Sequence, residues 1–278
     1  MIYLTIAVPA YNAAGTLEKC LDSFLEEAFW GRLEVVVVND GSTDDTESIA
    51  RAYQARRPEV FRLICQENGG HGAAVNAGLA AAKGKYFRIV DADDWVNPEG
   101  LEALLQAMEG AAPDCFLDQR TEVRGLTEAG MPVRLPEGAP VERVIPFEEI
   151  TTPEYARSIS MHALTCRTSH LREKGIRLME HTFYVDMQYV IGVTAFVRTA
   201  YLLPREVYFY RLGCDGQSVS YLNYVKNYRQ HDKVLKTCAD FCENRAGEMP
   251  EGRWEYMRFM LTLLARTQFN IALIYNPD

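Results

Sequence analysis

The fold of this chain is organised around the stretch Tyr86-Phe87-Arg88-Ile89-Val90-Asp91-Ala92-Asp93-Asp94-Trp95. Its first half is rich in residues that favour buried strands, and three carboxylates follow within four residues. Like charges this close repel each other, and a divalent cation held at the carboxyl end of the strand would relieve the repulsion. We therefore predict a strand over 86–90 that leads directly into a candidate metal site.

Strands and helices alternate regularly on the N-terminal side of this stretch. The expected elements are strands over 2–8, 34–38 and 61–65, and helices over 16–29, from Asp44 to Pro58, and over 73–82. This alternation indicates βαβ units with right-handed crossovers and a doubly wound parallel sheet. Because ligands bind outside the carboxyl ends of strands in such sheets, the loops 9–12, 39–43 and 91–95 should converge on one side.

The chain changes character after Pro113. Asn97 and Pro98 begin one more helix before that point. The elements expected beyond it are strands over 115–117 and 121–123, a hairpin or flap over 124–146, a βα passage over 163–175, a helix that Asp186 opens, strands over 201–203 and 207–210, and two or three helices over 221–278. We therefore predict a domain over 1–220 with a helical C-terminal extension over 221–278.

Composition and charge argue against several classes of protein. The net charge of −9 and the lack of a Lys/Arg stripe argue against a nucleic-acid partner. Seven cysteines without regular spacing indicate reduced thiols in the cytosol. No run has the length of a transmembrane helix, and the N-terminus reads as a strand and not as a signal peptide. We expect a cytoplasmic protein, with peripheral association at the inner face of the membrane left open.

The acidic cluster is the first candidate site. In an extended segment Asp91 and Asp93 would point to the same side, and Asp94 would point away. Magnesium and manganese take one or two protein carboxylates and complete their shell with water and phosphate oxygens. The alternative is a solvated turn in which Asp94 caps the next element of the chain. The position after a buried strand of a βαβ unit favours the metal site.

Three further features attract attention for their chemistry. Asp40 follows the most apolar strand and is suited to accept from a base N–H or a ribose hydroxyl, although a helix cap is the alternative. Gly69-Gly70-His71-Gly72 allows a ligand to approach the backbone closely, but it matches neither the dinucleotide fingerprint nor the P-loop. Asp186 opens a helix whose dipole would keep it ionised as a general base, or it is an ordinary helix-terminal carboxylate. Weaker candidates are Glu180, His181 and His162.

Four motifs in order and spacing resemble the family 2 glycosyltransferases of the GT-A fold, over about the first hundred residues. They are Ile6-Ala7-Val8-Pro9-Ala10-Tyr11-Asn12, Val37-Val38-Asn39-Asp40-Gly41-Ser42-Thr43-Asp44, Asn68-Gly69-Gly70-His71-Gly72 through Asn76-Ala77-Gly78, and Asp91-Ala92-Asp93-Asp94-Trp95. Tyr184-Val185-Asp186 and Gly216-Gln217-Ser218-Val219-Ser220 resemble the bacterial branch. The resemblance implies an α/β protein with the GT-A fold, a doubly wound Rossmann-like mixed sheet flanked by helices. A nucleotide-sugar-binding half would cover 1–112 and an acceptor half 113–220.

The resemblance also implies roles for individual residues. The donor would be bordered by Pro9, Ala10, Tyr11, Asn12, Asp40, Asn68, Gly69, Gly72, Asp91, Ala92, Asp93, Gln217 and Ser218. Within this set Asp40 would contact the base, while Gln217 and Ser218 would close over the diphosphate. Asp91 and Asp93 would hold Mn²⁺ or Mg²⁺, and Asp186 would be the catalytic base. Val185 departs from the family pattern, because many members carry Glu before the catalytic Asp.

The function implied is metal-dependent, inverting transfer of a sugar from a nucleotide-diphosphate sugar, most simply a UDP-sugar, to an acceptor hydroxyl. The acceptor would be a glycan or a lipid-linked molecule in cell-surface polysaccharide or glycan synthesis. One alternative is a sugar nucleotidyltransferase, which should carry a basic Gly-rich loop where this chain has Pro9-Ala10-Tyr11-Asn12. The other is a catalytically silent protein that binds nucleotide sugars.

Overall fold

The computed structural model describes residues 1–125, 129–213 and 221–275. Within that part the strands form one sheet in the order β3-β2-β1-β4-β9-β6-β10-β5, with β7 beside β6 and β8 beside β10. The strands are β1 Leu4–Ala10, β2 Leu33–Asp40, β3 Phe61–Gln66, β4 Tyr86–Ile89, β5 Trp95–Val96, β6 Cys115–Arg124, β7 Gly130–Val133, β8 Val144–Pro146, β9 Leu164–Arg167 and β10 Thr199–Leu212.

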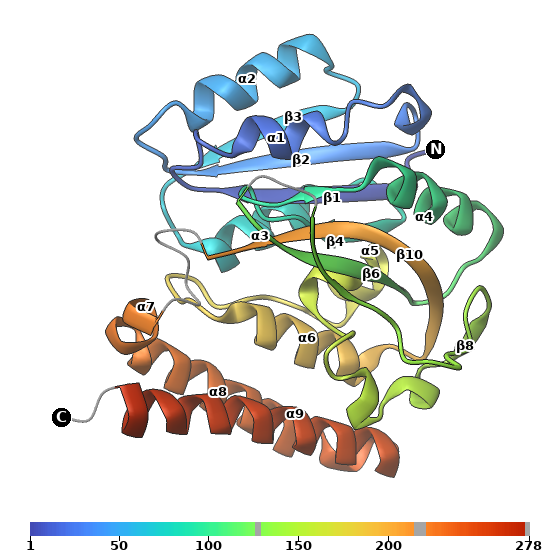
Figure 1. The fold of residues 1–278 in the computed structure, drawn as a ribbon, viewed down its shortest axis with the longest axis vertical. Coiled ribbons are helices and arrows are strands. Elements are labelled where there is room, and N and C mark those ends of the chain that lie inside the picture. The colour runs from blue at the N-terminus through green and yellow to red at the C-terminus, as the bar shows by residue number, and fades with distance from the viewer. Residues whose placement is uncertain (126–128, 214–220, 276–278) are drawn as a thin grey trace.

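Helices flank this sheet (Figure 1). They are α1 Leu17–Asp22, α2 Thr46–Arg56, α3 His71–Ala81, α4 Pro98–Gly110, α5 Thr168–Glu173, α6 Val185–Phe196, α7 Tyr221–Lys226, α8 Tyr228–Glu243 and α9 Glu251–Asn270, which continues as a π-helical turn over Ile271–Tyr275. Short 3₁₀ turns are η1 Glu27–Phe29, η2 Phe147–Ile150, η3 Pro153–Tyr155, η4 Met161–Ala163 and η5 Ala246–Glu248. The predicted N-cap of α4 is confirmed, because the Asn97 side chain accepts from the Glu99 and Gly100 N–H groups.

The sheet is parallel on one side and mixed on the other. β1 pairs in parallel with β2 and β4, and β2 with β3, as predicted from the alternation of strands and helices. β9 then runs antiparallel to both β4 and β6. The parallel pairing predicted for the N-terminal strands and the mixed sheet implied by the family resemblance are therefore both confirmed.

Several predicted bounds differ from those observed. The helix expected over 16–29 ends at Asp22 and is followed by η1. The strands expected over 201–203 and 207–210 are one strand, β10, whose register against β6 shifts on either side of Glu206. Pro204 lies at this irregularity, and because proline has no N–H to donate, a bulge lets the strand continue past it. Likewise, 115–117 and 121–123 belong to the single strand β6.

The two faces of the parallel strands bury different helices. Ile6 and Val8 pack with α1, α2 and α4, whereas Ala7 packs with α3, α5 and α6, because successive side chains alternate across a strand. Helix α3 lies especially close to β1, since a Cβ on Gly78 would come within 2.6 Å of the Ala7 Cβ. The parallel half is therefore a rigid platform whose carboxyl ends hold the loops in place.

The C-terminal helices pack against α6, on the side of that helix that faces away from the sheet (Figure 1). Cys238, Cys242 and Met257 are buried there with Tyr184, so these two cysteines are part of the core. Met260 is likewise buried in the core. Among the helices of the described residues, none combines the length and apolar character needed to cross a bilayer.

Candidate active site

A cleft of about 1370 Å³ opens beyond the carboxyl ends of β1 and β4, which is room enough for a nucleotide-sized ligand. The predicted site residues that line it are Pro9, Tyr11, Asn12, Asp91, Ala92, Asp93 and Asp186. The loop 39–43 lies against the loop 9–12, because the Thr43 N–H donates to Asn12 Oδ1 at 2.8 Å and the Asn12 N–H donates to Ser42 Oγ at 3.0 Å. The three loops therefore converge at one edge of the sheet, as predicted.

Asp40 lies behind the cleft and organises the glycine loop. Its carboxylate is buried and accepts from Gln66 Nε2 at 2.7 Å, from the Gly69 N–H at 3.0 Å and from the Gly70 N–H at 2.8 Å. Gly70 has a φ of +83°, which a residue with a side chain rarely adopts. A nucleotide base would have to share oxygens that already accept three hydrogen bonds. Contact between Asp40 and the base stays a prediction.

The glycine loop also lets the segment 178–181, which precedes α6, lie close to the start of α3. A Cβ on Gly72 would come within 2.1 Å of the Met179 carbonyl oxygen, so only glycine allows this approach. Asn76 holds the same segment by donating to the Leu178 carbonyl and accepting from the Leu178 N–H, each at 2.9 Å. Asn68, Gly69, Gly72 and Ala10 do not line the cleft and lie in the layer behind it.

The acidic segment after β4 is a tight turn. The Asp94 N–H donates to the Asp91 carbonyl at 3.0 Å, so the prediction of an extended segment is wrong. Asp94 is buried, and its two carboxylate oxygens accept from the Tyr208 hydroxyl at 2.5 Å and from the Arg211 N–H at 2.7 Å. Burial, with the charges of Asp93 and Asp91, raises the pKa of Asp94 well above its ordinary value. The turn therefore concentrates negative charge at the edge of the cleft.

His71 is a partner of this turn that the sequence did not identify. It begins α3 and lines the cleft, and its Nε2 lies 2.8 Å from Asp91 Oδ1. Burial alone would raise the pKa of Asp91, but the adjacent imidazole outweighs it, so the pKa of Asp91 lies below its ordinary value. The sequence showed His71 only as part of a glycine-rich loop, with no signal that its ring reaches the carboxylates 20 residues later.

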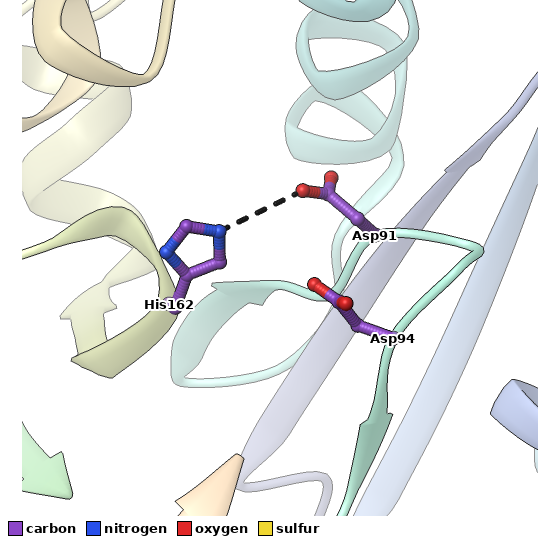
Figure 2. A group of neighbouring side chains, drawn as sticks. All are labelled: Asp91, Asp94 and His162. Carbon is purple, nitrogen blue, oxygen red and sulfur yellow. Dashed lines mark ion pairs between the residues drawn. The ribbon is translucent and has the colours of Figure 1, made fainter. Parts of the chain in front are cut away.

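His162 points toward Asp91 across the acidic turn (Figure 2). Ligand atoms of Asp91, Asp94 and His162 all lie within 4.8 Å of one another, which makes them a candidate metal-binding group. His162 is only 8% exposed, and burial lowers its pKa to about 4, so its imidazole is neutral near pH 7. It reaches the turn because β9, which follows η4, pairs antiparallel with β4.

Asp186 lies in the first turn of α6 and lines the same cleft. Burial raises its pKa above the ordinary value, against the opposing effects of the Met187 N–H and of His71. The helix terminus is therefore not the dominant influence on this carboxyl, contrary to the reasoning from the macrodipole. A raised pKa makes the carboxylate a stronger base, which suits proton abstraction from a hydroxyl.

The C-terminal helices complete the cleft. The residues that they contribute are Tyr224, His231, Met260, Leu263, Leu264 and Thr267. The ring of Tyr224 stacks on the ring of Tyr184, with the ring centroids 5.1 Å apart. Tyr184 lies two residues before Asp186. No motif in the sequence pointed to this wall of the cleft. Gln217 and Ser218, which the family resemblance placed over the diphosphate, lie outside the described residues.

Comparison with known proteins finds relatives that are named as glycosyltransferases or polysaccharide synthases. The model of glycosyl transferase family 2 matches residues 5–170. The chain is 41% identical over 102 residues to the uncharacterized glycosyltransferase YibD of Escherichia coli, covering 37% of this chain and 29% of YibD. It is 38% identical over 103 residues to chondroitin synthase of Pasteurella multocida, covering 37% of this chain and 10% of that protein. These matches thus span less than a third of either relative.

Solved structures share the fold at low identity. Residues 1–349 of TarS from S. aureus, in complex with UDP-GlcNAc, superpose with a TM-score of 0.69 at 20% identity, covering 97% of this chain and 73% of that one. The mannosyltransferase PcManGT from Pyrobaculum calidifontis, in complex with GDP-Man and Mn²⁺, gives a TM-score of 0.61 at 18% identity, covering 96% and 73%. Since the family model covers more than half of the chain and the GT-A fold agrees with it, the chain belongs to glycosyl transferase family 2.

Proposed function

We propose that the protein transfers a sugar from a UDP-sugar to an acceptor hydroxyl, with inversion at the anomeric carbon and with Mn²⁺ or Mg²⁺ bound. The observation that carries this proposal is the position of Asp186 on the same cleft as the acidic turn of Asp91 and Asp93. The carboxylates of the acidic turn would thereby hold the cation that binds the donor phosphates. The carboxylate of Asp186 would take the proton of the acceptor hydroxyl. Family membership and the UDP-GlcNAc held by S. aureus TarS support the choice of donor.

The donor end of the cleft would be formed by the loops after β1 and β4. Tyr11 is 54% exposed, so its ring is free to pack against a nucleotide base. Asn12 is fixed by its hydrogen bonds to 42–43, which would hold the loop in shape before the donor arrives. In this proposal Asp40, Asn68 and the glycines support the pocket from behind.

The acidic turn fits a divalent cation. Asp91 and Asp93 line the cleft, and the raised pKa of buried Asp94 reflects negative charge that a cation would offset. When bound, the cation would neutralise part of the diphosphate charge and so ease its departure. The protein's part is to present oxygen ligands on a short turn, held by His71 on one side and by Tyr208 on the other.

Asp186 would remove the proton from the acceptor hydroxyl as that oxygen attacks the anomeric carbon from the face opposite the diphosphate. A single displacement of this kind inverts the configuration, so an α-linked donor gives a β-linked product. The transition state has oxocarbenium-ion character, as in other glycosyl chemistry. Packing of Tyr184 against Tyr224 would fix the start of α6 and so the position of this base.

The acceptor would enter along the wall made by the C-terminal helices. That wall presents Met260, Leu263 and Leu264 beside the polar groups of His231 and Thr267. A mixed surface of this kind suits a glycan or a lipid-linked glycan. The names of two relatives, chondroitin synthase and hyaluronan synthase of Pasteurella multocida, support a role in polysaccharide synthesis. Peripheral association at the inner face of the membrane belongs to the same proposal.

The test is hydrolysis of a panel of UDP- and GDP-sugars without acceptor, measured with Mn²⁺, with Mg²⁺ and with EDTA. We expect slow, metal-dependent release of UDP from one UDP-sugar. Tight UDP binding without hydrolysis of any donor would instead identify a catalytically silent binding protein. Equal hydrolysis with EDTA would contradict the role of the cation.

A further inference from the structure

We infer that His162 is a nitrogen ligand of the cation, so that the site favours Mn²⁺ and other first-row transition metals over Mg²⁺. This inference rests on the proposed function, because it concerns the same cation. The acidic turn alone would give an all-oxygen site. The structure adds a nitrogen to these oxygens. The imidazole of His162, on η4 and far from the acidic turn in the sequence, is directed at Asp91 (Figure 2).

The distance between the two groups suits a shared ion. His162 Nε2 lies 3.9 Å from Asp91 Oδ2, which is too long for a hydrogen bond. Two ligands bound to one first-row ion at about 2.1 Å each are roughly 3 to 4 Å apart. Asp91 Oδ1 is already taken by His71 at 2.8 Å. The remaining oxygen of Asp91 therefore faces the imidazole across a gap of the size of a coordinated cation.

The imidazole is buried, and among the described residues no side chain or backbone group makes a hydrogen bond to either of its nitrogens. Its ring stacks on the ring of Tyr210, with centroids 4.1 Å apart, and meets the ring of Tyr208 edge-on, with centroids 5.2 Å apart. Its backbone carbonyl accepts from Arg88, which is itself fixed by Asp118. A buried polar ring held this firmly, without a hydrogen-bond partner, is preorganised for a ligand that arrives later.

The other carboxylate of the group is already occupied. Both oxygens of Asp94 accept hydrogen bonds, from Tyr208 and from the Arg211 N–H. Asp94 therefore holds the turn, whereas Asp91 and His162 each direct an atom into the gap. Mg²⁺ prefers oxygen ligands in near-octahedral geometry, and an imidazole ligand shifts preference toward transition metals.

The direct test is pulsed electron paramagnetic resonance of Mn²⁺ bound to the full chain in the presence of UDP. We expect a ¹⁴N coupling to Mn²⁺ that changes to a ¹⁵N coupling when the protein is labelled with ¹⁵N-histidine. Bound Mn²⁺ without any histidine nitrogen coupling would overturn the inference while leaving the proposed function intact. If the chain did not bind Mn²⁺ at all, both this inference and the metal dependence of the proposed function would be contradicted.

Variants give a second readout by calorimetry of Mn²⁺ and Mg²⁺ binding with UDP. His162→Gln should weaken Mn²⁺ binding about 10- to 100-fold and leave Mg²⁺ binding nearly unchanged. His162→Asp should reduce the difference between the affinities for Mn²⁺ and Mg²⁺, because it replaces a nitrogen ligand by an oxygen ligand. His170→Gln is the matched control, since that histidine bonds the Phe196 carbonyl on α6 and not the acidic turn. Equal Mn²⁺ affinity in His162→Gln, with native circular dichroism, would contradict the inference.

Discussion

His71 Nε2 lies 2.8 Å from Asp91 Oδ1, and this contact joins the first residue of α3 to the acidic turn after β4. The two elements are parts of different βα units, so the contact fixes the turn against the glycine loop. It also leaves the second oxygen of Asp91 directed away from α3. If Asp91 binds a cation as proposed, its carboxylate is thereby held in one orientation before the cation arrives.

Substitution of His71 should therefore weaken the acidic turn without removing a carboxylate. We expect His71→Gln to lower kcat/KM for donor hydrolysis about 10- to 100-fold, the usual cost of losing a partner that orients a metal ligand. His170→Gln, on α5, should remain near wild type. Wild-type kinetics in His71→Gln would show that Asp91 needs no orienting partner.

Asp93→Ala should abolish metal-dependent donor binding, because it removes one of two cleft-facing carboxylates of the turn. Calorimetry with UDP, with and without Mn²⁺, measures the effect. Asp45→Ala, a surface carboxylate before α2, is the control and should bind as wild type. If the Mn²⁺-dependent UDP affinity of Asp93→Ala were unchanged, the metal assignment at this position would be wrong.

Asp186→Asn should leave donor binding intact and lower kcat by about 10²-fold or more, since the amide cannot accept the acceptor proton. Donor affinity from calorimetry and kcat from product release separate the two effects. Persistent turnover would move the base elsewhere, with Glu180 and His181 tested next.

The activity of the wild-type protein should fall as pH decreases through the pKa of Asp186. The base must be ionised to act, and burial raises its pKa, so the acid limb should lie above the ordinary titration range of an aspartate. A pH profile of kcat for wild type shows this limb. Its midpoint at or below pH 4 would contradict the assignment of the base to a buried carboxyl.

Gly72→Ala should destabilise the protein by about 1–3 kcal/mol, because its Cβ would overlap the Met179 carbonyl oxygen. Gly110→Ala is the matched control: Gly110 ends α4, a Cβ there would meet no atom within 4 Å beyond its chain neighbours and the backbone of its own helix, and alanine favours the helix. Urea unfolding of both variants gives the comparison. Equal stability of Gly72→Ala and wild type would show that the segment 178–181 can move away from α3.

A buried ion pair supports the site from within the sheet. Arg88 donates to Asp118 through both terminal nitrogens, to Thr165 Oγ1 and to the His162 carbonyl, and both charged side chains are fully buried. Asp118→Ala should lower the free energy of unfolding by about 3–5 kcal/mol, since it leaves a buried guanidinium without its counter-charge. Denaturant unfolding measures this loss, and a loss below about 1 kcal/mol would contradict it.

The parallel half of the fold could be predicted because its signals are local. The run Glu34-Val35-Val36-Val37-Val38 is apolar on both faces, as a central parallel strand requires, and polar loops come after each strand end. Those loops do converge. The acidic turn could be located in the same way, although its Asp94 carboxylate is held by Tyr208 and Arg211, which are more than 100 residues away.

The rest of the site depends on contacts that no local pattern carries. The four residues of β9, Leu164-Thr165-Cys166-Arg167, carry no signal for the direction of the strand, and only its antiparallel pairing with β4 brings His162 to Asp91. Nothing in the sequence indicates that Asp40 accepts from the glycine loop, because its partners Gly69 and Gly70 lie 29 and 30 residues later. Met260 and Leu264 have the spacing of core residues, and they are core residues that also line the cleft.

Inverting transfer from a UDP-sugar is the central claim, and the anomeric configuration of the first product tests it most directly. Hydrolysis of an α-linked UDP-sugar can be followed by ¹H NMR on samples stopped with EDTA at early times. The β-anomer of the free sugar should appear first, at a rate that depends on the metal and falls about 10²-fold or more in Asp186→Asn. Initial release of the α-anomer, or the absence of hydrolysis of every donor tested, would contradict the claim.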